Sequence, residues 1–125
     1  HCPEPSLNAF MDIFQRRLSL AREWQNFFLK YPIILCPVST EPPFADLKDL
    51  ESPSAFDEVF NSMEPMIAPP FMGLPGLTVS TGKNKLGTPM GIQLIGARFS
   101  DKILLEAGKI IESKFKPIEA ITPSI

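Results

Sequence analysis

The stretch FMGLPGLTVSTG (71–82), followed closely by GTPMGIQLIG (87–96), decides how this chain folds. Leu77–Thr81 is a short run of residues that favour β-structure, and glycines bound it on both sides. Met90–Ile95 is a second apolar run, and glycines in the polar segment 82–87 suit a reversal that requires positive φ. The pattern therefore predicts two strands, and the short connection favours an antiparallel hairpin.

A long helix is predicted over residues 6–31, because apolar residues recur there at steps of three and four. Ser6 is the expected N-cap, and Pro32 should end the helix. We expect the helix to pack on a sheet through its apolar stripe. That stripe consists of Leu7, Phe10, Met11, Phe14, Leu18, Ala21, Trp24 and Phe28.

Two further helices follow from the same spacing. One should start at Ser54, which with Asp57 resembles a capping box, and Pro65 should end or kink it. The other is predicted over 101–115, with Ser100 as its cap and Pro117 as its stop. The last helix should bury Ile103, Leu104, Ala107, Ile110, Ile111 and Phe115.

The remaining segments complete an α/β fold with about three strands in one sheet and covering helices. Ile33–Cys36 is apolar throughout, which suits a central strand buried on both faces. Residues 39–53 are rich in proline and acidic side chains and lack periodicity, so we expect a flexible surface loop. The 125 residues suffice for one core.

Composition excludes several classes of partner. A net charge of −2, with scattered basic residues, gives no case for nucleic acid or an anionic membrane surface. No apolar stretch reaches the length of about 18 residues that suggests a membrane span. Cys2 and Cys36 are too few for a disulfide framework, so we expect both reduced, with Cys36 buried. A cytoplasmic location follows from this.

No residue pattern for catalysis or cofactor binding is present in the sequence. Phosphate-binding glycine motifs and G-x-S-x-G are absent, and His1 is the sole histidine, so we expect neither metal nor cofactor. Ser80 near Lys83 is the one local Ser/Lys grouping, and its position at a strand end favours a structural role. No catalytic residue is assigned.

Three segments together resemble the C-terminal part of the amidase signature family. They are LAREW (20–24), YPIILCPV (31–38) and the Gly-Leu-Pro…Gly-x-Pro-x-Gly-Ile-Gln-Leu-Ile-Gly order within 73–96. The resemblance implies a large α/β/α mixed-sheet fold and hydrolysis of a carbon–nitrogen amide bond by a Ser–Ser–Lys triad. That triad lies in the family's N-terminal half, on a Gly/Ser-rich segment that this sequence lacks. The chain, 1–125, is therefore expected to be one C-terminal segment of a larger amidase domain, inactive alone.

The resemblance also suggests partners and a site. The intact enzyme would bind a small-molecule amide, and this segment would contact the missing N-terminal part of the same chain or self-associate. Positions that resemble the wall of the substrate pocket are Met63, Met66, Ile67 and Phe71. Core packing is the alternative role for these four residues.

Some positions depart from the family pattern. Pro70 stands where many members have asparagine, Ser80 where many have proline, and Met63 near an aspartate of the amidotransferase members. These departures argue against an amidotransferase component that acts on misacylated transfer RNA, and they favour a plain amidase. A free-standing, non-catalytic α/β interaction module is the alternative function.

Overall fold

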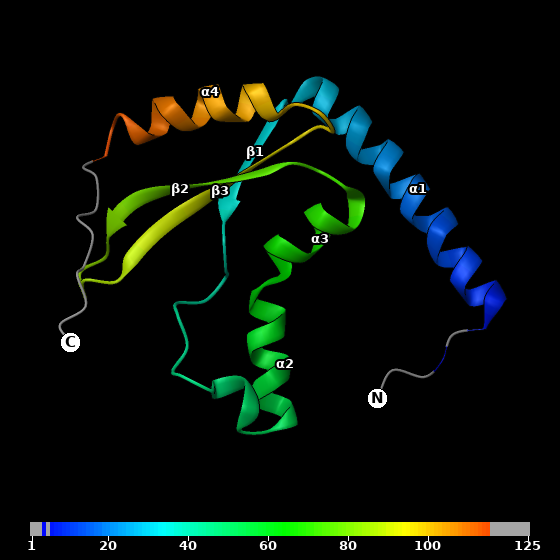
Figure 1. The fold of residues 1–125 in the computed structure, drawn as a ribbon, viewed down its shortest axis with the longest axis horizontal. Helices are drawn as coiled ribbons and strands as arrows, with labels where there is room; N and C mark the ends of the chain where they lie inside the picture. Colours follow the sequence, from blue (N-terminus) through cyan, green and yellow to red (C-terminus); the bar gives the residue numbers. More distant parts are fainter. Residues whose placement is uncertain (1–3, 5, 116–125) are drawn as a thin grey trace, which may run out of the picture.

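A three-stranded antiparallel sheet forms the centre of the fold (Figure 1). The structure is a computed structural model that describes residue 4 and residues 6–115. The strands β1 (Ile33–Pro37), β2 (Gly76–Lys83) and β3 (Pro89–Gly96) lie in the order β1-β3-β2. β2 and β3 pair antiparallel as the predicted hairpin. The side-chain oxygen of Asn84 closes the reversal by accepting from the backbone N–H groups of Leu86 and Thr88.

The prediction that Ile33–Cys36 is a central strand is wrong for the described sheet. β1 lies at an edge, and Leu35 leaves 59% of its surface exposed. β3 occupies the centre, where Leu94 is 1% exposed and pairs with Leu35 on one side and Leu77 on the other. An apolar run indicates a strand, but strand order is decided by which partners it meets across the sheet.

The helix α4 (Asp101–Glu112) covers one face of the sheet, as predicted. Leu104 packs there against Val79 and Leu94. Two details differ from expectation. Ser100 is the N-cap residue as predicted, but its hydroxyl donates to the carbonyl of Ala97 at 2.7 Å and makes no capping hydrogen bond to α4. Ile103, Ile110 and Phe115 of the predicted stripe are exposed. The expected stop at Pro117 lies outside the described residues.

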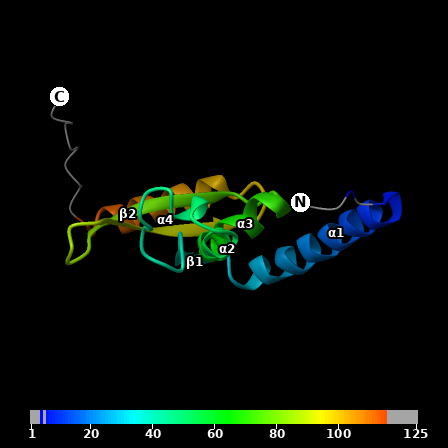
Figure 2. The same ribbon diagram turned by 90° about the horizontal axis from the view of Figure 1, so that it is seen from below.

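The opposite face carries α2 (Pro53–Ser62) and α3 (Glu64–Met72), so helices lie on both sides of the sheet (Figure 1). The helix α1 (Leu7–Lys30) reaches this face through Phe28 and otherwise projects past the end of the sheet (Figure 2). The core there combines Phe28 of α1, Met72 of α3, and Leu74 with Ile95. Cys36 packs beside this cluster, half-buried rather than fully buried as predicted, and without a disulfide. Cys2 lies outside the described residues.

Only the C-terminal half of α1 contacts the core, so the predicted packing of this helix on the sheet is limited to that half. Ser6 caps the helix as expected, with its hydroxyl accepting from the N–H of Ala9. From there α1 runs away from the sheet along most of its length (Figure 1). The stripe residues in this projecting half are exposed: Leu7, Phe10, Met11, Phe14 and Leu18.

Among the helices of the described residues, none combines the length and the apolar character that a membrane span requires.

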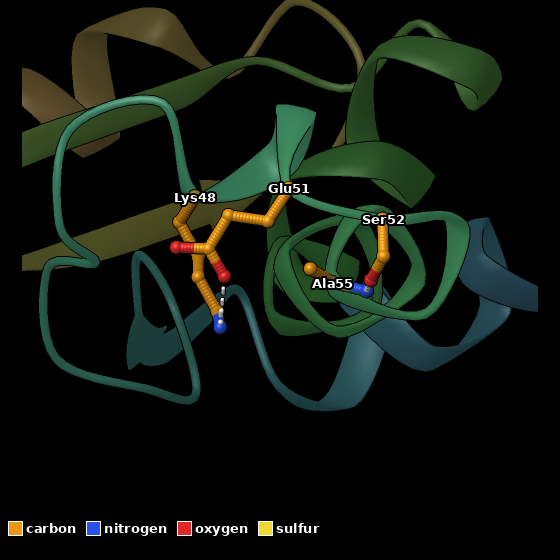
Figure 3. Close-up of polar contacts among 4 residues, drawn as sticks. All are labelled: Lys48, Glu51, Ser52 and Ala55. Atoms are coloured by element: carbon orange, nitrogen blue, oxygen red, sulfur yellow. Dashed lines mark hydrogen bonds and ion pairs between the residues drawn. The ribbon is translucent and has the colours of Figure 1, made fainter.

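The α2–α3 region differs most from the sequence-based prediction. Ser52, not Ser54, caps α2, because its hydroxyl accepts from the N–H of Ala55 at 3.1 Å (Figure 3). Pro65 lies in the first turn of α3, where a missing N–H costs nothing, so a new helix begins where we expected one to end. Pro69 and Pro70 lie inside α3.

The segment between β1 and α2 is largely exposed, as expected of a surface loop, but it contains the short 3₁₀ helix η1 (Lys48–Leu50). Lys48 Nζ lies 2.8 Å from Glu51 Oε2 (Figure 3). This hydrogen bond raises the pKa of Lys48. The expected flexibility of 39–53 stays a prediction.

Candidate functional site

An open cavity of about 760 Å³ lies between the segment after β1, the α2–α3 junction and the hairpin. Three parts of the chain that are distant in sequence build it. Its lining residues are Pro37–Phe44, Val59, Ser62, Met63, Met66, Thr78, Ser80, Asn84, Pro89, Met90 and Gly91. The lining is mainly apolar. Its polar side chains are the hydroxyls of Ser39, Thr40, Ser62, Thr78 and Ser80, the amide of Asn84 and the carboxylate of Glu41. Such a surface suits a neutral ligand with an apolar body and a few polar groups.

Hydrogen bonds fix the wall that the segment 37–44 forms. The N–H of Thr40 donates to the carbonyl of Ser62 at 2.9 Å, and the Thr40 hydroxyl lies 3.4 Å from the same oxygen. The Ser62 side chain, 3% exposed, donates to the carbonyl of Val59 at 2.7 Å. The segment is thus attached to the last turn of α2, and the two form one wall.

The structure separates the four residues predicted as substrate wall. Met63 and Met66, at the α2–α3 junction, both line the cavity. Ile67 and Phe71 are exposed and do not belong to the lining. Phe71 instead faces α1: its carbonyl accepts a hydrogen bond from Arg17 Nε, and the Arg17 guanidinium carbon lies 5.8 Å from its ring centroid.

Sequence reasoning missed the segment 37–44 as part of the site and assigned Glu41 to a surface loop. Pro37, Pro42 and Pro43 were the available signal, since prolines restrict the backbone and favour a defined course. Their number could indicate an ordered segment, but not that it folds back over the hairpin.

Nothing in the described part of the chain assembles a nucleophile with its base. Ser80 lines the cavity, but within residues 6–115 no base is hydrogen-bonded to its hydroxyl, and Lys83 is not among the lining residues. Among the described residues no three His, Cys, Asp or Glu side chains cluster as metal ligands. What this arrangement offers is a binding wall.

Comparison with known proteins assigns the chain. The family model described as Amidase matches residues 6–105. This chain belongs to the amidase family. It is similar to the indoleacetamide hydrolase of Bradyrhizobium diazoefficiens, with 33% identity over 109 residues that cover 86% of this chain and 21% of that protein. The layers of helix, sheet and helix described above fit the α/β fold expected from the resemblance.

Amidotransferase subunits match at similar identity. The A subunit of glutamyl-tRNA(Gln) amidotransferase from Zymomonas mobilis is 33% identical over 100 residues, covering 78% of this chain and 19% of that protein. Its counterpart from Treponema denticola is 30% identical over 115 residues, covering 90% and 21%. The chain thus spans about a fifth of the length of the curated relatives it matches. The sequence-based preference for a plain amidase over such an amidotransferase component stays a prediction.

Proposed function

We propose that this chain is the C-terminal portion of an amidase that hydrolyses a carbon–nitrogen amide bond. In this proposal it supplies core strands and one wall of the substrate pocket, while the Ser–Ser–Lys triad lies in sequence outside it. The observation that carries the proposal is a mainly apolar cavity in an amidase-family chain, in which no base is hydrogen-bonded to Ser80 among the described residues.

Met63 and Met66 are the residues proposed to contact the substrate. Their thioether side chains are flexible and polarizable, so they adapt to an apolar acyl group more readily than branched side chains do. Since the lining carries one carboxylate and no basic side chain, the substrate favoured is a neutral or weakly cationic amide. Ile67 and Phe71 keep a role only if the rest of the protein closes a second wall beside α1.

The N-terminal remainder of the same amidase domain is proposed as the partner that covers the exposed stripe of α1. Apolar patches of this kind normally mark an interface. Self-association of the chain is the alternative occupant. The cytoplasmic location expected from the isolated cysteines also stays part of the proposal.

A test compares the full-length protein with its Met66→Ser and Ile67→Ser variants on a panel of neutral amides that differ in acyl size. Met66→Ser should raise KM for bulky acyl groups about tenfold, the scale set by the apolar surface that is lost, and leave small amides unaffected. Ile67→Ser is a matched change at the neighbouring position, outside the cavity. It should leave KM for bulky acyl groups unchanged. Absence of amide hydrolysis by the full-length protein would refute the proposal.

A further inference from the structure

The carbonyl of Pro65 lacks its helical partner. In an α-helix this oxygen would accept from the N–H of residue 69, but that residue is Pro69, which has no N–H. The side-chain amide of Gln93 takes the place of the missing donor, with Nε2 lying 3.2 Å from the Pro65 oxygen. A residue of β3 therefore satisfies a carbonyl of α3 that a proline leaves without its helical donor.

Gln93 is well placed to hold this contact. It lies on the central strand, is 7% exposed, and pairs in register with Cys36 of β1 and Thr78 of β2. Among the described residues, no fully buried side-chain nitrogen or oxygen lacks a hydrogen-bond partner. A polar side chain in this position is costly unless it is satisfied, so its bond to Pro65 is the reason it can be buried there.

We infer that Gln93 is a positioning residue for the cavity wall. Pro65 lies between Met63 and Met66 in the chain. The carbonyl of Met63 accepts a hydrogen bond from the N–H of Met66 at 2.8 Å, so the two methionines and Pro65 belong to one turn. Anchoring the Pro65 carbonyl to the sheet therefore fixes both methionines relative to Thr78 and Gly91, the hairpin residues that line the same cavity. This inference rests on the proposed function for its kinetic consequence, but the anchoring itself does not.

The anchoring is tested by a double-mutant cycle in the full-length protein, read by hydrogen exchange of the α3 amides. Gln93→Met keeps the side-chain length and removes the donor, and Pro69→Ala restores a helical N–H to the Pro65 carbonyl. In the otherwise native protein, Gln93→Met should accelerate hydrogen exchange of the amides in 64–72 about tenfold. In a protein that also carries Pro69→Ala, the same substitution should accelerate exchange much less. Gln93→Asn, whose amide is too short to reach, provides the same comparison if Gln93→Met does not fold.

The kinetic arm separates positioning from general stability. Gln93→Met should raise KM for a bulky neutral amide with little change in kcat, and Pro69→Ala should restore KM. Ile111→Ala, which weakens packing on the opposite face of the sheet, should lower stability without moving KM. Equal exchange effects of Gln93→Met in both backgrounds would overturn the inference. If the full-length protein hydrolyses no amide, the proposed function fails, and the exchange cycle still decides the role of Gln93.

Discussion

Gly108 of α4 lies directly against Leu77 of β2: a Cβ added to Gly108 would stand 2.5 Å from Cδ2 of Leu77. Glycine in a helix normally costs up to about 1 kcal/mol relative to alanine, so its presence here has a packing reason. Without a side chain at this position α4 approaches the sheet closely enough for Leu104 to be buried beside Val79 and Leu94.

Gly108→Ala should therefore destabilise the fold in spite of its better helix propensity. Overpacking typically costs about 1–3 kcal/mol, which exceeds the propensity gain. Lys109→Ala, at the exposed neighbouring position, controls for propensity alone and should leave the denaturation midpoint nearly unchanged. A higher midpoint for Gly108→Ala would show that α4 has room to move away from Leu77.

The two serines before α2 offer a matched pair. Ser52→Ala removes the hydroxyl that accepts from the N–H of Ala55 and should cost about 1 kcal/mol of unfolding free energy. Ser54→Ala alters a residue inside the first turn and should cost little. Equilibrium urea unfolding of both variants measures the difference, and a larger loss at Ser54 would contradict the observed cap.

Cys36 should make stability fall at alkaline pH. Burial raises the pKa of its thiol above the unfolded value, so the folded state favours the protonated form. The stability from this shift is fully present below the unfolded pKa and is lost as pH rises through the folded pKa. Urea unfolding midpoints measured across this pH range should decline more steeply with rising pH in the protein that has Cys36 than in its Cys36→Ala variant. Parallel curves would mean that the thiol is not desolvated.

The 125-residue chain by itself should not hydrolyse amides, because Ser80 has no base hydrogen-bonded to it in the described part of the chain. Purified chain and its Ser80→Ala variant are compared with the full-length protein in a generic amide assay. If the isolated chain hydrolyses amides and Ser80→Ala abolishes this activity, the nucleophile lies within the chain and the proposal that it lies elsewhere in the protein is wrong.

The exposed stripe of α1 should bind a hydrophobic dye in the isolated chain. Phe10 and Phe14, with ring centroids 4.8 Å apart, are 48% and 44% exposed. Replacing both by serine should reduce dye fluorescence and any self-association seen by sedimentation. Leu86→Ser, which removes an exposed side chain from the hairpin turn, should change neither. A monomer that binds no dye would instead favour a self-sufficient module.

Local patterns predicted the elements of this fold better than their contacts. The hairpin, the Ser6 cap and the position of α4 depend on residues close in sequence, and all three were predicted. The edge position of β1 and the projection of α1 depend on partners far along the chain, which periodicity does not reveal. Pro65 was predicted to end or kink the second helix, and α2 does end at Ser62. The start of α3 at Glu64 was not predicted, because a proline that ends one helix and one that starts the next look alike in sequence.

The candidate site was predicted in part for the same reason. Met63 and Met66 could be named from their place before Gly-Leu-Pro. Thr40 and Glu41 join the cavity only because the Thr40 N–H reaches the Ser62 carbonyl across a long loop. Gln93 is a polar interruption of a strand in sequence, and its role is visible only beside an α3 that contains Pro69.

The strand order β1-β3-β2 has a consequence for synthesis of the chain. The strand in the middle is the last of the three to leave the ribosome. Until Pro89–Gly96 has emerged, neither β1 nor β2 can find its observed neighbour, and the nascent apolar segments of both remain unpaired. A stalled or truncated product ending before Pro89 would therefore carry β1 and β2 without the strand that joins them, which makes it a natural substrate for chaperones and quality-control proteases.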